Sequence, residues 1–522
     1  MFNKEKLKEW LKKKENLILL AVVIIAFLIR IYYFTITSSQ PLWWDEAEYM
    51  SAAKGFAGIV HYHLDAIRSP GFPLFASIFF IIGISNEVAL RFLILLIPSL
   101  ILIVLTYFTI KEMYPDKRIA IISTLIIAVL WENLFYSNRF HTENLALIFE
   151  LLAIFILVKV YLKKKDLWVI KPKYSIIWIA LFSLISILFR PGNVIFIPAI
   201  VVFLLIVNKS KILTKKGLPI TIGIIALGII AFFVLGLQNN AFFATYLKSF
   251  QTHAPFTWSN LSFFYGIYQS PVQYLPSILF YAFLLGVIFF VVDMFLFSKK
   301  IKSINNTSED LEIKSDILNM LIILSIMSFF IFFMRPPTYE FRWFFPLMTG
   351  LLVFTAKGIV TFSEYIGDFL KSKKLVIILI IILTLLGVYA QFVHADAIIK
   401  IKIPTYQQVK DAGLWIKQNS NKNDVVVAAS ITQLTYYGER KIEDFYVNNS
   451  NENESAFDIK VKNVNPKYMV ISVFEPGFTP QWAYDWPQRH NQTLTPIKMY
   501  LLDDQDSPAL VIYEFKNYSK TA

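Results

Sequence analysis

The sequence predicts a polytopic α-helical membrane protein of about eleven transmembrane helices, followed by a small α/β domain. The first supporting observation is composition. Of the 522 residues 56% are hydrophobic, and the mean hydropathy is +0.55, whereas soluble chains contain about 45–50% apolar residues. The second is that the apolar residues gather in runs long enough to cross a bilayer, which takes ~20 residues. The third is a change of composition near residue 394, after which no long apolar run occurs.

Eleven apolar runs are the predicted transmembrane helices. A twelfth run, Phe72–Ile84, is too short to span, and we expect it to dip into the membrane surface or to pack on the bundle. The eleven runs are Leu17–Ile36, Val88–Ile110, Ile119–Phe135, Leu145–Leu162, Ser175–Phe189, Val194–Val207, Leu218–Leu237, Pro276–Phe297, Ile317–Met334, Trp343–Val360 and Leu375–Val393.

The positions of the basic residues predict the orientation of these helices. Loops on one side carry 26 lysines and arginines and loops on the other side carry seven, and the richer side of a membrane protein faces the cytoplasm. Residues 1–16 are therefore a basic cytoplasmic segment on the lipid surface, 17–393 the membrane domain and 394–522 an extracytoplasmic domain. The first span is too long for a cleavable signal, so we expect a retained anchor in the cell membrane. The net charge of +13 thus reflects topology and does not indicate a nucleic-acid partner.

The polar tail alternates helical and strand patterns. A helix is predicted over Tyr406–Gln418, with Val409, Leu414 and Ile416 as its core positions. Strands are predicted at Asp424–Ala429, Tyr468–Phe474 and Ala509–Phe515. We interpret the tail as a small α/β domain for docking or substrate access.

Chemistry is expected at the outer ends of the spans, because acidic residues beside a membrane core are costly to desolvate and are usually functional. The first outer loop, 37–87, opens with Trp43-Trp44-Asp45-Glu46-Ala47-Glu48-Tyr49. On a helix Asp45 and Tyr49 share one face, and a carboxylate in the first turn is favoured by the helix dipole. A simple capped surface helix explains the same pattern equally well.

Further charges at other outer ends favour a functional interpretation. On the predicted topology Arg139, Glu143, Arg190 and the segment 335–342 converge with Asp45 on one membrane face. Arginine forks bind phosphate oxygens, while a carboxylate can serve as a base. The outer loop 238–275 is rich in aromatic residues, which stack on sugars or lie on the membrane surface.

These motifs resemble the C-type membrane glycosyltransferases, the family that includes protein O-mannosyltransferases and aminoarabinose transferases. The resemblance rests on short motifs in the same order along residues 17–390. The motifs are Asp45-Glu46-Ala47-Glu48-Tyr49, Arg68-Ser69-Pro70-Gly71-Phe72-Pro73, Arg139 preceding Glu143, and Arg342-Trp343-Phe344-Phe345-Pro346. At position 143 an Asp is commoner in the family, so the longer side chain makes this match weaker than the one at Asp45.

The resemblance implies an enzyme that transfers a hexosyl, mannosyl or pentosyl group, with inversion, from a polyprenyl or dolichyl phosphate. The acceptor is an extracytoplasmic protein, lipid or glycan. Asp45 would be the base, and Glu143 a second acid. Arg68, Arg139, Arg190, Arg342 and Tyr339 would bind the donor phosphate or lipid, supported by Glu46, Glu48 and Tyr49. No particular cofactor is implied, but a divalent metal is compatible with the site, and His61, His63 and His141 could ligate it. A lipid or sugar transporter or flippase without transferase chemistry is the alternative function.

Overall fold

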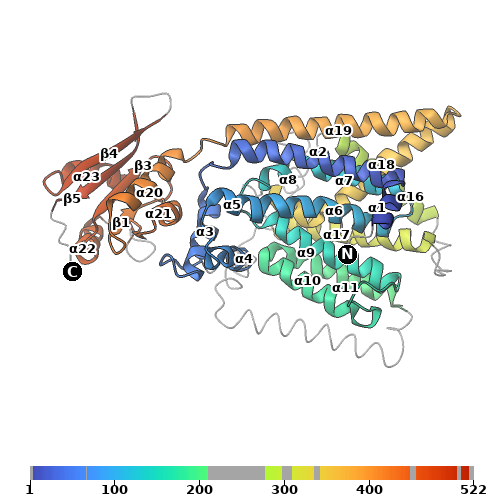
Figure 1. Ribbon diagram of the computed structural model, residues 1–522, viewed down its shortest axis with the longest axis horizontal. Helices are drawn as coiled ribbons and strands as arrows, with labels where there is room; N and C mark the ends of the chain where they lie inside the picture. Colours follow the sequence, from blue (N-terminus) through green and yellow to red (C-terminus); the bar gives the residue numbers. More distant parts are fainter. Residues whose placement is uncertain are drawn as a thin grey trace.

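A computed structural model describes residues 4–65, 68–209, 277–296, 308–333, 341–446, 454–502 and 507–516. It has a helical membrane domain and, beside it, a C-terminal domain with a small sheet (Figure 1). The predicted fold class is therefore confirmed. The helices of the membrane domain are α1 (Lys4–Leu11), α2 (Lys14–Thr37), α3 (Trp44–Phe56), α4 (Gly71–Ile81), α5 (Glu87–Arg91), η1 (Phe92–Leu96), α6 (Ile97–Met113), α7 (Lys117–Val129), α8 (Trp131–Tyr136), α9 (Glu143–Ile156), η2 (Leu157–Leu162), η3 (Pro172–Tyr174), α10 (Ser175–Phe189), η4 (Pro191–Ile195), α11 (Phe196–Val207), α16 (Ser277–Leu296), α17 (Ser308–Phe333), η6 (Phe341–Leu347), α18 (Met348–Phe369) and α19 (Lys373–Ile401).

Seven helical runs in the described ranges are long and apolar enough to cross a membrane, and each coincides with a predicted span. Two more predicted spans fall on α17 and on the shorter apolar helix α11, and Leu218–Leu237 lies outside the described residues, as does the loop 238–275. The run at Phe72–Ile84 is the 11-residue helix α4, too short to span as predicted. The seven runs are Lys14–Thr37, Glu87–Met113, Glu143–Leu162, Pro172–Phe189, Ile278–Phe295, Phe345–Phe369 and Lys373–Ile401.

The prediction of one continuous span over Ile119–Phe135 is wrong. Helix α7 ends at Val129, Leu130 has ψ 123°, and the short helix α8 follows. The break is stabilised by a buried arginine from another helix, since Arg30 donates from Nη1 to the carbonyl of Ala128 at 2.7 Å and from Nη2 to Asn133 Oδ1 at 2.6 Å. Because these partners come from distant segments, the local sequence carries no signal for the break.

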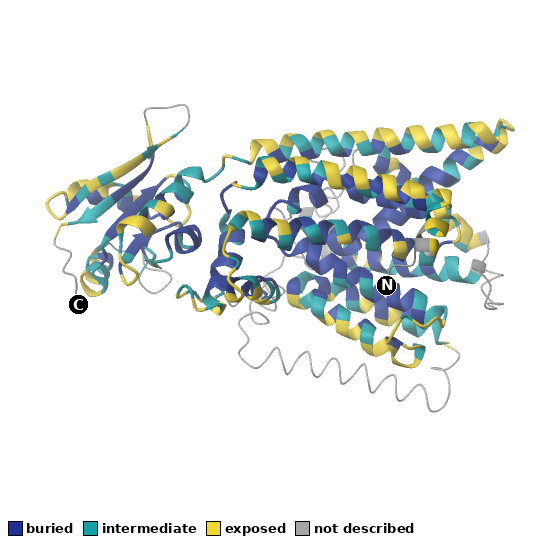
Figure 2. Ribbon diagram, viewed as in Figure 1, coloured by how far each residue is buried: buried dark blue, intermediate teal, exposed yellow. Residues whose placement is uncertain are grey.

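The outer helices present apolar side chains outward. Figure 2 shows exposed residues along the outer edge of α19. They include Ile377, Ile381, Leu385 and Tyr389, which recur every fourth residue on one helix face and are between 50% and 68% exposed. An apolar stripe of this length on a helix surface is typical of contact with lipid.

The C-terminal domain has a five-stranded sheet in the order β2-β1-β3-β5-β4. Strand β1 pairs in parallel with β2 and β3, whereas β5 pairs antiparallel with β3 and β4. The predicted helix and three strands are confirmed as α20, β1, β3 and β5. The elements are α20 (Gln407–Asn419), β1 (Val425–Ala428), α21 (Ile431–Gly438), β2 (Lys441–Glu443), α22 (Glu454–Val464), β3 (Tyr468–Ser472), α23 (Gln481–Arg489), β4 (Leu494–Leu501) and β5 (Pro508–Phe515).

One predicted core position of α20 is wrong. Val409 and Ile416 are fully buried, but Leu414 is 39% exposed. The buried set is Val409, Ala412, Gly413 and Ile416, and at 100° per residue Leu414 lies well away from that face.

Helix α21 of the C-terminal domain packs against α3, the helix that carries Asp45. Lys54 of α3 donates to the carbonyl of Tyr436 at 2.8 Å and to Glu439 Oε1 at 2.7 Å. The ring of Trp44 stacks on Phe478 with 4.7 Å between centroids. The C-terminal domain therefore supports the first outer loop from the side opposite the bundle.

Candidate active site

Asp45 lies in the first turn of α3 and is held by two arginines, Arg68 from later in the same loop and Arg342 from η6. Its Oδ1 accepts from Arg68 Nη2 at 2.5 Å, and its Oδ2 accepts from Arg342 Nη1 at 2.8 Å. The Asp45 side chain is 20% exposed. Burial by itself would raise the pKa of Asp45, but the charges of Arg342, His141 and Arg68 outweigh burial and lower it to about 2. The site thus contains a carboxylate that is ionised at neutral pH, between two guanidinium groups.

The start of α3 explains why three nearby acids point in different directions. Trp43 is extended and donates its backbone N–H to Glu46 Oε2 at 2.9 Å, which turns Glu46 back toward the helix start. Asp45 and Glu48 are three residues apart and so share a face. Arg68 reaches both of them, because its Nε also donates to Glu48 Oε2 at 2.9 Å.

Glu48 has a different environment from Asp45 although both contact Arg68. Glu48 is buried, and this desolvation raises its pKa to about 7 against the opposing charge of Arg68, with Asp45 adding to the rise. Two carboxyl groups whose pKa values are pushed apart are typical of a site with distinct acid–base roles.

We expect Glu48→Gln to stabilise the protein at pH 8 and not at pH 5. The pKa of Glu48 is higher in the folded than in the unfolded chain, so folding retains its proton and stability falls as pH rises from about 4.5 to about 7. The loss is on the order of 3 kcal/mol, and the uncharged amide avoids it. Thermal unfolding in detergent at both pH values measures this, and equal melting temperatures of variant and wild type at pH 8 would contradict it.

Glu46 and Arg139 form a buried ion pair that fastens α3 to the segment before α9. Arg139 Nη1 donates to Glu46 Oε2 at 2.9 Å, and the backbone N–H of Phe140 donates to Glu46 Oε1 at 2.8 Å. Arg139 also donates to the carbonyl of Lys402 at 3.0 Å, and its guanidinium lies 3.9 Å from the centroid of the Trp43 ring. Arg139 was predicted to bind the donor phosphate; in the structure its guanidinium contacts Glu46, the carbonyl of Lys402 and the Trp43 ring.

A second charged group lies at the start of α9. Glu143 is buried, with Oε1 3.8 Å from Arg190 Nη1 and Oε2 3.8 Å from His141 Nδ1. Burial lowers the pKa of His141, although Glu143 and Glu46 oppose the effect. Within the described ranges, Arg190 Nη1 and Glu143 Oε2 are buried atoms without a hydrogen-bond partner. Such atoms indicate capacity to bind a further polar group.

The two charged groups belong to one site. The charges of Arg342 and His141 act on both Asp45 and Glu143. Helix η6 contributes to both groups, since it carries Arg342, which pairs with Asp45, and Phe345, whose ring centre lies 5.8 Å from the Arg190 guanidinium. The structure therefore brings together Asp45, Glu48, Arg68, Glu143, Arg190 and Arg342, with Tyr49 packed beside Arg68.

Close backbone approach places Arg68 beside the end of α10. The Ser69 hydroxyl donates to the carbonyl of Leu188. A Cβ atom on Gly71 would collide with the same carbonyl, so only glycine fits there. Arg190 follows Leu188 by two residues, which explains why the motif around Arg68 lies near Arg190.

The remaining predicted residues are placed elsewhere. His61 and His63 lie in an exposed part of the first loop with ring centroids 5.1 Å apart. Tyr339 lies outside the described residues. Among the described residues, no group of three or more His, Asp or Glu side chains is arranged to hold a metal ion.

Two features of the site were missed from the sequence. Glu150, seven residues after Glu143 on the same helix face, is fully buried and accepts from Asn193 Nδ2 at 3.2 Å. An acid inside an apolar run was the available signal. The stacking of Phe478 on Trp44 had no sequence signal, because it depends on how the two domains pack.

Comparisons with known proteins agree with this architecture. A family model for Dolichyl-phosphate-mannose-protein mannosyltransferase matches residues 67–235. The chain has no significant match among curated proteins.

Solved structures of other proteins align with most of this chain. The oligosaccharyltransferase AglB from Archaeoglobus fulgidus, in complex with an inhibitory peptide and a dolichol-phosphate, aligns with a TM-score of 0.59 and 12% identity over 88% of this chain and 69% of AglB. ArnT from Cupriavidus metallidurans bound to undecaprenyl phosphate aligns with a TM-score of 0.52 and 10% identity over 94% of this chain and 97% of ArnT. The chain therefore has the fold of the C-type membrane glycosyltransferases, as the resemblance of its motifs predicted.

Proposed function

We propose that this protein transfers a sugar from a polyprenyl-phosphate or dolichyl-phosphate donor to an extracytoplasmic acceptor, with inversion. The oxygen of an acceptor hydroxyl forms a bond to the anomeric carbon, and the bond from that carbon to the phosphate oxygen breaks. The electron pair leaves with the lipid phosphate, and the hydroxyl proton passes to a carboxylate. A phosphate leaves without a strong general acid, so one ionised carboxylate suffices for this chemistry.

The observation that carries the proposal is the position of Asp45 between Arg68 and Arg342. A carboxylate with a pKa near 2 is a weak base while two guanidinium groups hold it. Phosphate oxygens compete for the same arginine forks. Donor binding would draw Arg68 and Arg342 toward the phosphate and away from Asp45. The basicity of Asp45 would then rise when a group is needed to take the proton of the acceptor hydroxyl.

Glu143 and Arg190 complete the proposed site. The Nη1 atom of Arg190, which has no hydrogen-bond partner in the described part of the chain, can donate to a phosphate oxygen. Glu143 is suited to hold the acceptor, because its Oε2 likewise accepts no hydrogen bond there. Opposite charges aimed at the leaving phosphate stabilise the transition state more than the ground state.

The fold neighbours support a lipid-linked donor in general terms. Their structures contain dolichol-phosphate and undecaprenyl phosphate, and nothing in the comparisons favours the transporter or flippase. On the orientation predicted from the lysine count, the site faces the outside of the cell membrane, and the C-terminal domain lies beside the path of an approaching acceptor.

A membrane assay with radiolabelled donors tests the proposal. Membranes containing the full chain are incubated with undecaprenyl-phosphate and dolichyl-phosphate carrying mannose, a pentose or a short oligosaccharide, with and without a chelator. We expect label to move from the lipid phase to an acceptor fraction with at least one donor, and a matching nucleotide sugar to give none. Transfer from the nucleotide sugar alone, or the absence of transfer with every lipid donor, would contradict the proposal. Loss of transfer when the chelator is added would establish a metal requirement.

A further inference from the structure

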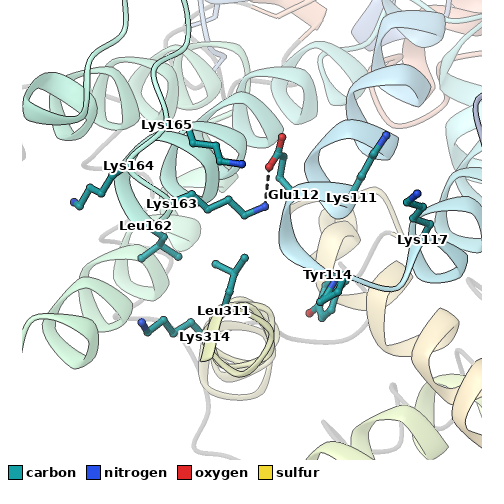
Figure 3. Close-up of a pocket in the computed structure, with 11 residues that line it drawn as sticks. Lys111, Glu112, Tyr114, Lys117, Leu162, Lys163, Lys164, Lys165, Leu311 and Lys314 are labelled. Atoms are coloured by element: carbon teal, nitrogen blue, oxygen red, sulfur yellow. Dashed lines mark hydrogen bonds and ion pairs between the residues drawn. The ribbon is translucent and has the colours of Figure 1, made fainter. Parts of the chain in front are cut away.

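A strongly basic cavity lies far from Asp45. Its volume is about 650 Å³, within the range of about 300–1,000 Å³ typical of ligand sites. It lies where α6 ends and α7 begins, next to the end of η2 and the first turns of α17 (Figure 3). Its lining residues are Lys111, Glu112, Tyr114, Pro115, Lys117, Leu162, Lys163, Lys164, Lys165, Leu311 and Lys314.

The lining carries an excess of positive charge. Six of its eleven residues are lysines and only one is acidic. Glu112 is already neutralised, since Lys163 lies 2.7 Å and Lys159 3.3 Å from its carboxylate oxygens. Lys117 pairs with Glu15 at 2.6 Å. Lys111, Lys165 and Lys314 form no ion pair with any residue that the structure describes, so their charges are available to a ligand.

The cavity is separate from the candidate active site. The active site and the cavity lie at opposite ends of the helical run Glu87–Met113. Arg91, near its start, donates to the carbonyls of Gln40 and Asn138 beside the Asp45 loop, whereas Lys111 lies near its far end. Twenty residues at 1.5 Å per residue separate the two positions by about 30 Å. A donor whose phosphate lies at Asp45 therefore cannot place that phosphate in this cavity.

We propose that this cavity binds a phosphate group, either the headgroup of an anionic phospholipid or a soluble phosphate compound. Lysines from four chain segments surround one hollow, and ammonium groups bind phosphate oxygens as compact point charges. Leu162 and Leu311 lie between the lysines in Figure 3 and give an apolar surface next to the charges. The cavity lies at the ends of membrane-length helices, where basic pockets between helices meet lipid headgroups.

The competing explanation is that these lysines only set the membrane orientation. That explanation requires only that the lysines lie on the cytoplasmic side of the membrane. Any lysines on that side should then contribute equally to phosphate binding, whether or not they line the cavity. A matched set exists where α18 is followed by α19: Lys371 in the turn and Lys373 and Lys374 at the start of α19 are exposed and do not line the cavity.

The test compares two triple variants of the full chain in phosphatidylcholine nanodiscs. One variant is Lys111→Gln, Lys165→Gln and Lys314→Gln, and the control is Lys371→Gln, Lys373→Gln and Lys374→Gln. Each loses three positive charges. We expect the cavity variant to bind fluorescent phosphatidylglycerol about tenfold or more weakly than wild type, and the control to stay within about twofold. The single variant Lys314→Gln, expected to bind roughly threefold more weakly, serves if the triple variant does not fold.

A second probe separates the two sources of phosphate. Inorganic pyrophosphate is added to the same samples, and its binding is read as a rise in melting temperature. If only pyrophosphate binding is weakened by the loss of the cavity lysines, the ligand is a soluble phosphate compound. If only binding of the labelled lipid is weakened, the ligand is a lipid headgroup. Equal weakening in both triple variants, or binding of both probes that is independent of the cavity lysines, would overturn the proposal.

Discussion

Asp45→Asn is expected to abolish sugar transfer while the protein remains folded. The amide keeps an oxygen that can accept from Arg68 or Arg342, but it cannot take a proton from an acceptor. Loss of a positioned base typically costs 10²–10⁴-fold, so we expect a rate reduced by about 10³-fold. The pKa of Asp45 is lower in the folded chain than in the unfolded chain, so its negative charge stabilises the folded chain at any pH above about 4. We expect the loss of this charge to lower the free energy of unfolding by on the order of 2 kcal/mol. Initial rates with the active donor and thermal unfolding measure the two effects.

The matched control is Asp116→Asn. Asp116 pairs with Arg118 at 2.6 Å and lies at the start of α7, away from Asp45. Its Oδ1 accepts the backbone N–H of Arg118, an N-terminal capping role that Asn fills equally well. This variant should transfer sugar at the wild-type rate. Transfer by Asp45→Asn at a rate similar to the control would refute the role of Asp45.

Arg139→Gln is expected to destabilise the protein more than any change at the exposed arginines. The variant removes the charge partner of Glu46, which is completely buried and pairs with Arg139 at 2.9 Å. Leaving a buried charge without its partner typically costs about 3–5 kcal/mol. Thermal unfolding in detergent, with the yield of monodisperse protein, measures the effect.

A double variant distinguishes a structural Arg139 from one that binds phosphate. Glu46→Gln combined with Arg139→Gln removes both charges, so it should recover part of the lost stability relative to Arg139→Gln alone. If Arg139 instead contacts the donor phosphate, Arg139→Gln would keep its melting temperature and bind the lipid donor more weakly. That result would restore the role that the sequence analysis assigned to Arg139.

The spans were predictable because their signal is local. A helix in lipid satisfies its own backbone hydrogen bonds, so an apolar run of sufficient length is enough to specify it. The break after Val129 was not predictable, because Arg30 and Gln391 supply the partners for the broken helix from positions 98 and 260 residues away. In α20 the hydrophobic residues correctly predicted Val409 and Ile416, but Leu414 lies about 140° from Val409 around the helix at 100° per residue, so the spacing itself argues against Leu414 as a core position.

By itself, the sequence determined the membrane class and the α/β tail, and it singled out Asp45 as the residue to test, since each depends on residue type and local spacing. Only the tertiary structure decided which acid each arginine contacts. Arg68 and Arg342 reach Asp45, whereas Arg139 contacts Glu46, and nothing in the sequence around each arginine indicates which acid it meets. The reason is physical: the role of a guanidinium depends on which acid lies within about 3 Å of it, and those acids are brought there by long-range packing of helices and of the C-terminal domain.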